Sequence, residues 1–204
     1  YPEKTSSPSD ETVLSIEGVS QTGIVKDISF EIKKGEILGV FGLMGSGRTE
    51  LARIIFGLDP LGAGEVQLRG ESLEPMDPIL RIKKGMAFVT EDRRDEGLLL
   101  DVSIAENLGL VSLRDYTQSL VKIINDDKMV EDGKNIKQTL QIKSEAIEKA
   151  PAKSLSGGNQ QKVVIGKWLM SNPSAVILDE ATRGIDVGAK YEVYTIMNDL
   201  AKDG

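Results

Sequence analysis

A glycine-rich stretch early in the chain reads Gly42-Leu43-Met44-Gly45-Ser46-Gly47-Arg48-Thr49. Its spacing is that of a phosphate-binding loop, in which glycines let the backbone approach phosphate oxygens and a hydroxyl residue reaches magnesium. Thr49 stands at the hydroxyl position, whereas Arg48 stands where such loops carry lysine. The stretch therefore predicts a cradle for a phosphate chain with one departure from the usual pattern; the alternative is a glycine-rich turn.

The flanking residues predict a strand before this loop and a helix after it. The run Ile37-Leu38-Gly39-Val40-Phe41 is continuously apolar, as in a strand that is covered on both faces. After the loop, apolar residues recur at the spacing of one helix face, at Leu51, Ile54, Ile55 and Leu58. Strand, glycine loop and helix thus follow in the order that places backbone N–H groups and a helix N-terminus against phosphate.

A second stretch reads Val176-Ile177-Leu178-Asp179-Glu180, an apolar strand that ends in two acids. Such a pair suits nucleotide chemistry, because Asp179 can position magnesium while Glu180 polarises the attacking water. A solvated acidic pair at a strand end is the alternative. The position downstream of a phosphate loop favours the nucleotide interpretation.

A third stretch reads Leu155-Ser156-Gly157-Gly158-Asn159-Gln160-Gln161. A hydroxyl, two glycines and a helix start follow one another, so Ser156 is predicted to cap the helix while backbone N–H groups close on a second anion. An ordinary capped helix would account for Ser156 but not for the two consecutive glycines.

The remaining pattern predicts an α/β fold. Residues 13–32 alternate as in a small antiparallel sheet, and Met86-Ala87-Phe88-Val89 indicates a buried strand with Glu91 just past its carboxyl end. From about 101 to 154 the sequence becomes helical and charged, which predicts an inserted helical subdomain. A helix is predicted to begin at Tyr191.

The length, residue composition and net charge limit the chemistry and the partners that this chain can have. The 204 residues suffice for one domain with a subdomain, and the absence of cysteine and histidine leaves acid-base work to carboxylates or lysine. A net charge of -7 argues against nucleic acid as a partner. Apolar runs fall far short of the roughly 20 residues that span a bilayer, and the polar start at residues 1–12 is typical of a linker.

These features together resemble the nucleotide-binding domain of an ABC transporter, over residues 13–204. In that family residues 42–49 correspond to the Walker A loop, 155–161 to the signature, 176–180 to Walker B and 184–186 to the D-loop. More narrowly, the chain resembles the second, C-terminal ATP-binding half of bacterial monosaccharide importers of the ribose and galactose type. The resemblance is carried by residues 42–51, 91–94, 155–163 and 182–188.

The resemblance implies a P-loop fold with a mainly parallel central sheet, an antiparallel β subdomain and a helical subdomain, truncated at the C-terminus. It implies that ATP and Mg²⁺ are bound, with Glu180 as the catalytic carboxylate. The phosphates would lie on Gly42, Leu43, Met44, Gly45, Ser46, Gly47, Arg48 and Thr49. The magnesium ligands or sensors would be Thr49, Asp179 and Glu91.

The same resemblance implies partners. Two such domains close head to tail, so Ser156, Gly157, Gly158 and Gln160 would serve the partner's nucleotide in trans. The partner would be a second ABC domain fused N-terminally, attached to permease subunits and served indirectly by a sugar-binding protein. The location implied is cytoplasmic, peripheral on the inner face of the cell membrane.

Several positions depart from the family pattern. Arg48 is bulkier and more forked than a lysine and predicts weak ATP binding and poor turnover by this domain alone. Glu91 takes the place of the Q-loop glutamine, although residues 91–96 could also form a solvated, self-neutralising loop. Residues 18–27 contain no aromatic side chain for adenine, and the usual switch histidine would lie beyond Gly204. Trp168 is predicted to be core.

Three other functions compete with a transport ATPase. A noncatalytic half that merely completes its neighbour's site is favoured by Arg48 and disfavoured by the intact Glu180. A soluble ABC protein of translation or DNA repair would need basic surfaces. A small-molecule kinase or GTPase has no need for residues 155–161.

Overall fold

The computed structural model of the chain describes residues 2–3, 6–75, 77–117 and 123–203. Parts of the predicted linker (residues 1, 4 and 5) and of the predicted helical subdomain (residues 118–122) lie outside the described residues, as do 76 and 204. The chain forms two compact units. Unit 1 comprises Tyr1–Phe88, Pro173–Asp179 and Tyr194–Gly204, and unit 2 comprises Val89–Asn172 and Glu180–Val193.

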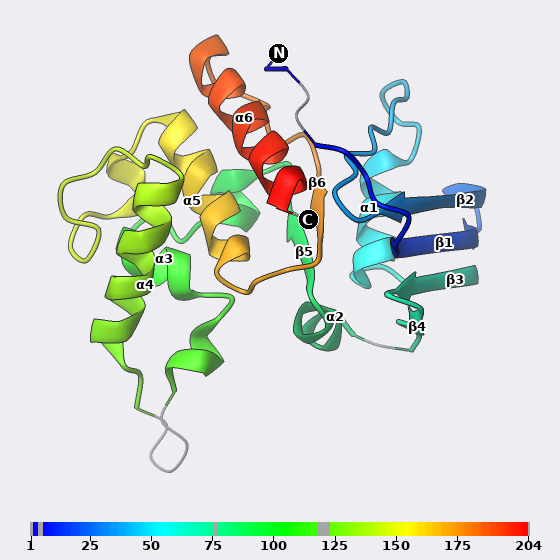
Figure 1. Cartoon of the computed structure of the whole chain (residues 1–204), viewed down its shortest axis with the longest axis horizontal. Helices are drawn as coiled ribbons and strands as arrows, with labels where there is room; N and C mark the ends of the chain where they lie inside the picture. The colour runs from blue at the N-terminus through cyan, green and yellow to red at the C-terminus, as the bar shows by residue number, and fades with distance from the viewer. Residues whose placement is uncertain (1, 4–5, 76, 118–122, 204) are drawn as a thin grey trace. The chain divides into compact units, whose positions relative to one another are not determined.

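Unit 1 contains a four-stranded antiparallel sheet (Figure 1). Its strands lie in the order β2-β1-β3-β4, with bounds β1 Thr12–Gln21, β2 Val25–Lys33, β3 Ala63–Leu68 and β4 Glu71–Ser72. Ile16 pairs with Phe30 on one side and with Val66 on the other. Ile16 and Val66 are buried, which is what the alternation of apolar residues predicts. The predicted antiparallel sheet is confirmed.

A second, parallel sheet pairs β5 (Met86–Val89) with β6 (Ala175–Leu178). All four residues of β5 are buried, as predicted, whereas those of β6 are only half-buried. Helix α1 (Arg48–Phe56) packs on β5 through Phe56, whose ring centroid lies 5.3 Å from that of Phe88. Gly57 is the C-cap of α1 in the left-handed conformation, which confirms the predicted glycine at the helix end, whereas Leu58, predicted on the apolar face, lies beyond the helix and is exposed. Helix α2 (Pro78–Lys84) precedes β5.

The predicted strand at residues 37–41 is wrong: this run belongs to no strand in the structure. Val40 is 51% exposed and Phe41 94% exposed. An apolar run favours burial, but a strand also requires a neighbouring strand to hydrogen-bond to, and Gly39 weakens the strand preference in the middle of the run. The ring of Phe41 lies against Gly39 instead, so that a side-chain carbon there would be 3.2 Å from Phe41 Cε2.

Unit 2 is mainly helical. Its elements are η1 (Arg93–Gly97), α3 (Ile104–Gly109), η2 (Leu113–Tyr116), α4 (Asp126–Thr139), η3 (Ala152–Ser154), α5 (Gly157–Leu169) and residues 187–193 of α6 (Val187–Asp203). Helix α3 packs against both α4 and α5 (Figure 1). The helices approach closely at Gly166, where a side-chain carbon would lie 2.7 Å from Ile136 and 2.9 Å from Leu108.

The caps of these helices follow from the sequence. Ser103 and Glu106 form a reciprocal capping box at the start of α3, and Ser156 caps α5 as predicted. Helix α6 begins before the predicted Tyr191, because Asp186 Oδ1 accepts the N–H of Ala189 at 2.9 Å and so satisfies a free donor of the first turn. Within the described part of the chain, no helix combines the length and the apolar character needed to cross a bilayer.

Candidate nucleotide-binding site

The glycine-rich loop in unit 1 is open to solvent. Residues 41–46 are all exposed, Met44 by 98%, and Gly47 is the first buried residue after them. The carbonyl of Leu43 accepts the N–H of Ser46 at 3.1 Å, which closes the loop, and Gly47 is the N-cap of α1. Helix α1 therefore presents its N-terminus, with the partial positive charge of its first N–H groups, at the end of an exposed loop.

Two glycines of this loop have backbone angles that other residues rarely adopt. Gly45 has a φ of 78° and Gly47 a φ of 84°. A side-chain carbon at Gly45 would meet nothing within 4 Å, so packing within the chain does not explain the glycine there. Conformation and open space together leave the backbone at Gly45 accessible, as a phosphate cradle requires.

The two acids after β6 differ in surroundings. Asp179 is buried and directly follows the last residue of β6. It belongs to unit 1, as does Thr49 in the first turn of α1. Glu180 opens the next segment of unit 2, is exposed and has a φ of 44°, a left-handed conformation that is unfavourable for a residue with a side chain. Its carbonyl accepts the N–H of Arg183 at 2.8 Å, so residues 180–183 form a turn.

The start of α5 is organised around Ser156, whose exposed side chain accepts from the backbone of Asn159. Asn159 also donates its Nδ2 to Ser156 Oγ at 3.0 Å and accepts the N–H of Lys143 at 2.8 Å. Gly158 is buried against Ala189 of α6, and Gln160 is buried with its Nε2 3.4 Å from the carbonyl of Ala152. Of the predicted residues, Ser156 therefore faces solvent while Gln160 faces the interior of its unit.

Glu91 and its neighbours border a hollow of about 430 Å³ in unit 2, lined by Glu91, Asp92, Arg93, Arg94, Arg183 and Gly184. Glu91 forms an ion pair with Arg183, and Arg93 donates to the carbonyls of Arg183 at 3.0 Å and Gly184 at 3.2 Å. Asp92 caps η1, because its carboxylate accepts hydrogen bonds from the backbone N–H groups of Asp95 and Arg94. These hydrogen bonds lower the pKa of the Asp92 carboxyl. Both Glu91 and Arg93 thus bind the 183–184 segment rather than each other.

The sequence of this chain matches a known protein family. Residues 25–183 match the family model described as ABC transporter. The chain belongs to the ABC transporter family. The structural neighbours are ATP-binding cassettes, which confirms the predicted α/β P-loop fold.

Several sugar import ATP-binding proteins align with this chain over its whole length. It is 48% identical to the ribose import ATP-binding protein of Oceanobacillus iheyensis and 46% identical to that of Bacillus subtilis, in each case over all of this chain but only 40% and 41% of the relative. A putative ribose/galactose/methyl galactoside import ATP-binding protein of Agrobacterium fabrum is 43% identical, with the same coverage of 100% and 40%. The chain therefore spans about two fifths of the length of these relatives.

Solved structures of ABC cassettes share the fold. A nucleotide-free ATP-binding cassette from an ABC transporter superposes with a TM-score of 0.80 at 23% identity, covering 95% of this chain and 78% of that one. A dimeric ATP-binding cassette in a post-hydrolysis state bound to ADP and phosphate gives a TM-score of 0.75 at 22% identity, with coverage of 93% and 83%.

Buried cations of the ABC chain were missed from the sequence. Lys162 pairs with Glu192 at 2.7 Å, and Lys167 donates to the carbonyl of Gly97. The contacts of the half-buried Arg93 with the carbonyls of Arg183 and Gly184 were missed as well. The only sequence signal for the two lysines is weak: they are the only charged residues of α5, which otherwise carries apolar, small and uncharged polar residues.

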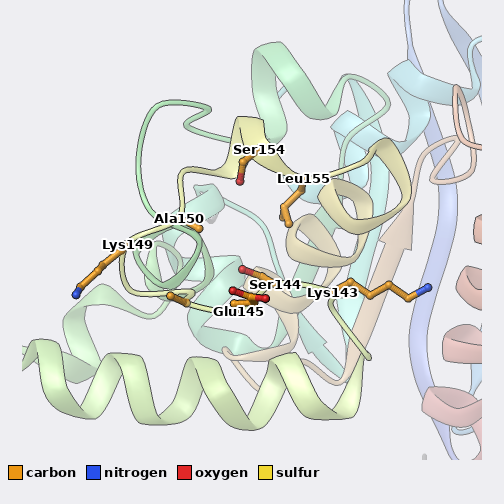
Figure 2. A pocket seen from close by; sticks show the side chains of 8 residues that line it. Lys143, Ser144, Glu145, Lys149, Ala150, Ser154 and Leu155 are labelled. Carbon is orange, nitrogen blue, oxygen red and sulfur yellow. The ribbon is translucent and has the colours of Figure 1, made fainter.

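A second hollow, of about 480 Å³, lies beside the segment that precedes the signature and is lined by residues 143–146, 149–150 and 154–155. In Figure 2 the side chains of Lys143 and Lys149 extend to opposite sides, away from the other lining residues. The lysines therefore do not converge on a common anion, and of the predicted nucleotide motifs only Leu155, the first residue of the signature, borders this hollow.

The described residues contain no cluster of three or more acidic, histidine or cysteine side chains that could hold a metal ion by themselves. The buried carboxylate of Asp179 and the hydroxyl of Thr49, both in unit 1, are oxygen donors of the type that magnesium takes in sites where phosphates and waters supply the other ligands.

Lys167 gives a testable pH dependence. It is 6% exposed, its Nζ donates to the carbonyl of Gly97 at 2.5 Å, and burial lowers its pKa to about 8. Between about pH 8 and 10.4 the unfolded chain then binds more protons than the folded chain at this site, so stability rises with pH across that window and is flat below it. We expect a gain of about 3 kcal/mol in the unfolding free energy relative to a Lys167→Met variant.

Urea unfolding followed by the fluorescence of Trp168, the only tryptophan, measures this gain between pH 7 and 10. The variant Lys153→Met, which removes an exposed lysine, serves as the control. Parallel stability curves for wild type and Lys167→Met would contradict the expected dependence.

Proposed function

We propose that this chain is the ATP-binding domain of a sugar importer, which binds Mg-ATP and couples its hydrolysis to sugar uptake. The observation that carries the proposal is similarity over the whole of this chain, at 43–48% identity, to ribose and galactose import ATP-binding proteins. It is supported by three nucleotide motifs in the order that such proteins need. Because the chain spans only part of its relatives, transport requires parts beyond it.

In this proposal the loop of residues 42–49 holds the phosphates, with Gly45, Ser46, Gly47 and Arg48 closest to them. The open, left-handed Gly45, the left-handed Gly47 and the helix N-terminus at Arg48 support this role. Thr49 and Asp179 would hold Mg²⁺, with Glu91 as its sensor, and Glu180 would orient the attacking water. Magnesium, when bound, would supply positive charge that offsets the negative charge of the phosphates during transfer.

The signature would serve a neighbouring site. Ser156, Gly157, Gly158 and Gln160 would complete the nucleotide site of a second ABC domain, with the hydroxyl of Ser156 and the N-terminus of α5 aimed at its phosphates. The exposure of Ser156 at the start of a 13-residue helix supports this role. The burial of Gln160 gives it a supporting place behind the helix start.

The wider assembly follows from the same proposal. Residues 13–204 would form the ATP-binding domain, with residues 1–12 as a linker to an N-terminal second domain and about 101–154 as the helical subdomain. Permease subunits would receive the motion, and a sugar-binding protein would deliver the substrate. The domain would then lie on the cytoplasmic face of the cell membrane.

Arg48 is the sharpest test of this function. Its guanidinium is planar and forked where a slim ammonium normally lies between phosphates, so we expect the wild-type chain to bind ATP weakly and to hydrolyse it poorly. With a partner ABC domain present, Arg48→Lys should raise ATP turnover at this site by about tenfold. Equilibrium dialysis of labelled ATP measures binding, and single-turnover hydrolysis measures the chemistry.

Arg53→Lys, on the same helix but paired with Asp59, is the matched control and should leave turnover unchanged. If Arg48→Lys binds ATP tightly but does not hydrolyse it, the domain is a noncatalytic half that completes its neighbour's site, the alternative function that the presence of Arg48 also supports. If neither protein binds ATP, the proposed function is wrong.

A further inference from the structure

Arg93 makes the most specific long-range contact of the candidate site. It lies half-buried at the start of η1 and donates through both terminal nitrogens, from Nη1 to the carbonyl of Arg183 at 3.0 Å and from Nη2 to the carbonyl of Gly184 at 3.2 Å. Two successive carbonyls are thus held by one planar fork. A lysine, with a single point charge on a flexible stem, could not reproduce this geometry.

The segment that Arg93 holds is the turn that begins at Glu180. The N–H of Arg183 donates to the carbonyl of Glu180 at 2.8 Å, and Glu180 has a φ of 44°. A left-handed conformation at a residue with a side chain persists only where its surroundings enforce it. Arg93 therefore fixes the end of the turn whose first residue is strained.

The same guanidinium lies against the start of α5. A side-chain carbon at Gly157 would be 3.1 Å from Arg93 Nη2 and 3.6 Å from the carbonyl of Gly184. The far end of η1 also contacts α5, because Lys167 donates to the carbonyl of Gly97 and a side-chain carbon at Gly97 would lie 3.1 Å from Val164. Thus η1 is attached to α5 at both ends and to the 180–184 turn at one.

Helix stability does not explain this placement. A cation at a helix N-terminus meets the positive end of the helix dipole and is unfavourable there. The Nε of Arg93 is moreover buried without a hydrogen-bond partner among the described residues. The cation at a helix N-terminus and the unpartnered Nε are thus both retained where Arg93 contacts the 180–184 turn and the start of α5.

We infer that Arg93 is a positioning residue that fixes the Glu180 turn to the first turn of α5. The carboxylate proposed for this domain's own nucleotide and the signature residues proposed for the partner's nucleotide are then held as one body. A shift at either site is transmitted to the other through one guanidinium. The functional part of this inference rests on the proposed function; the mechanical part does not.

The mechanical part is tested on the chain alone, without nucleotide, by hydrogen exchange. In Arg93→Ala we expect the amides of residues 181–184, including the N–H of Arg183, to exchange about tenfold faster, and those at the start of α5 to follow. Arg93→Gln provides a second variant with a single donor in case the alanine variant does not fold. Arg94→Ala, which removes the exposed neighbouring arginine, is the matched control and should exchange like wild type. Exchange within twofold of wild type in both Arg93 variants would overturn the inference.

The functional part uses the chain together with a partner ABC domain. Arg93→Ala should lower kcat at both shared sites by about 10- to 100-fold while KM for ATP stays unchanged, because groups are misplaced rather than binding lost. Arg93→Lys should stay close to the alanine variant, since it keeps the charge without the fork. A fall at only one site would contradict the coupling. Loss of all ATP hydrolysis in the wild-type pair, with exchange behaving as expected, would overturn the proposed function and leave the mechanical role intact.

Discussion

Gly158→Ala is expected to lower ATP hydrolysis at the site shared with a partner domain by about 100-fold. A side-chain carbon at Gly158 would lie 2.5 Å from Cβ of Ala189, whereas carbon atoms in contact normally lie about 3.5–4.0 Å apart. Either α5 or α6 must therefore move by about 1 Å, a displacement large enough to misplace the neighbouring Ser156. The same overpacking should cost about 1–3 kcal/mol of stability.

A compensating substitution makes this prediction specific. In the double variant Gly158→Ala with Ala189→Gly, the total number of side-chain carbons at the contact is unchanged, so most of the lost hydrolysis should return. Ala189→Gly alone costs about 1 kcal/mol through helix propensity and should leave hydrolysis near wild type. Steady-state hydrolysis with the partner domain and thermal unfolding of each variant complete the cycle. A double variant no more active than Gly158→Ala would show that the contact with Ala189 is not the cause.

The elements that could be predicted are those whose signal is local. Helix α1 follows from its apolar spacing and from Gly57, and the start of α5 follows from Ser156, because a capping side chain and a helix face act within a few residues. The antiparallel pairing of β1 and β2 follows from alternation along each strand. In all these cases the residues that determine the structure lie within one element or its neighbour.

The parts that could not be predicted depend on distant partners. Residues 37–41 have the composition of a buried strand, yet strand formation needs a neighbour whose identity no local pattern gives. The acidic and basic residues 91–96 suggest neutralisation within the loop, whereas Glu91 and Arg93 bind residues about 90 positions away. The predicted site residues themselves stay predictions, because their chemistry awaits a nucleotide and a partner.

Buried cations are the second class that sequence patterns miss. A lysine or arginine in a helix is normally predicted to lie on the face that contacts solvent. This prediction is wrong where other elements cover the helix on all sides. Helix α5 contacts η1, α3 and α4, so Lys162 and Lys167 lie inside and satisfy their charges on Glu192 and on backbone carbonyls. Arg81 in unit 1 is the most buried of these cations.

Arg81→Ala is expected to destabilise unit 1 by about 3–5 kcal/mol, the largest stability effect of any substitution considered. Arg81 is 1% exposed; its Nη1 donates to the carbonyl of Ile55 at 2.7 Å and its Nη2 forms an ion pair with Glu74. Removing it leaves the buried carbonyl of Ile55 without this donor and Glu74, whose side chain is 34% exposed, without its ion pair; it also removes a large side chain from the interior of the unit. It also opens space beside Gly57, where a side-chain carbon would lie 2.6 Å from Arg81 Nε.

The consequence should reach the phosphate loop, because Ile55 and Gly57 end the helix that this loop begins. Hydrogen exchange of the α1 amides measures the loss, since the only tryptophan lies in unit 2. Lys84→Ala, which breaks an exposed ion pair on the same helix α2, is the matched control and should change little. Arg81→Met with Glu74→Gln should recover much of the stability, because Glu74→Gln removes the carboxylate charge that is left unpaired without the arginine and methionine refills part of the space. Unchanged α1 protection in Arg81→Ala would mean that the buried arginine does not anchor the end of this helix.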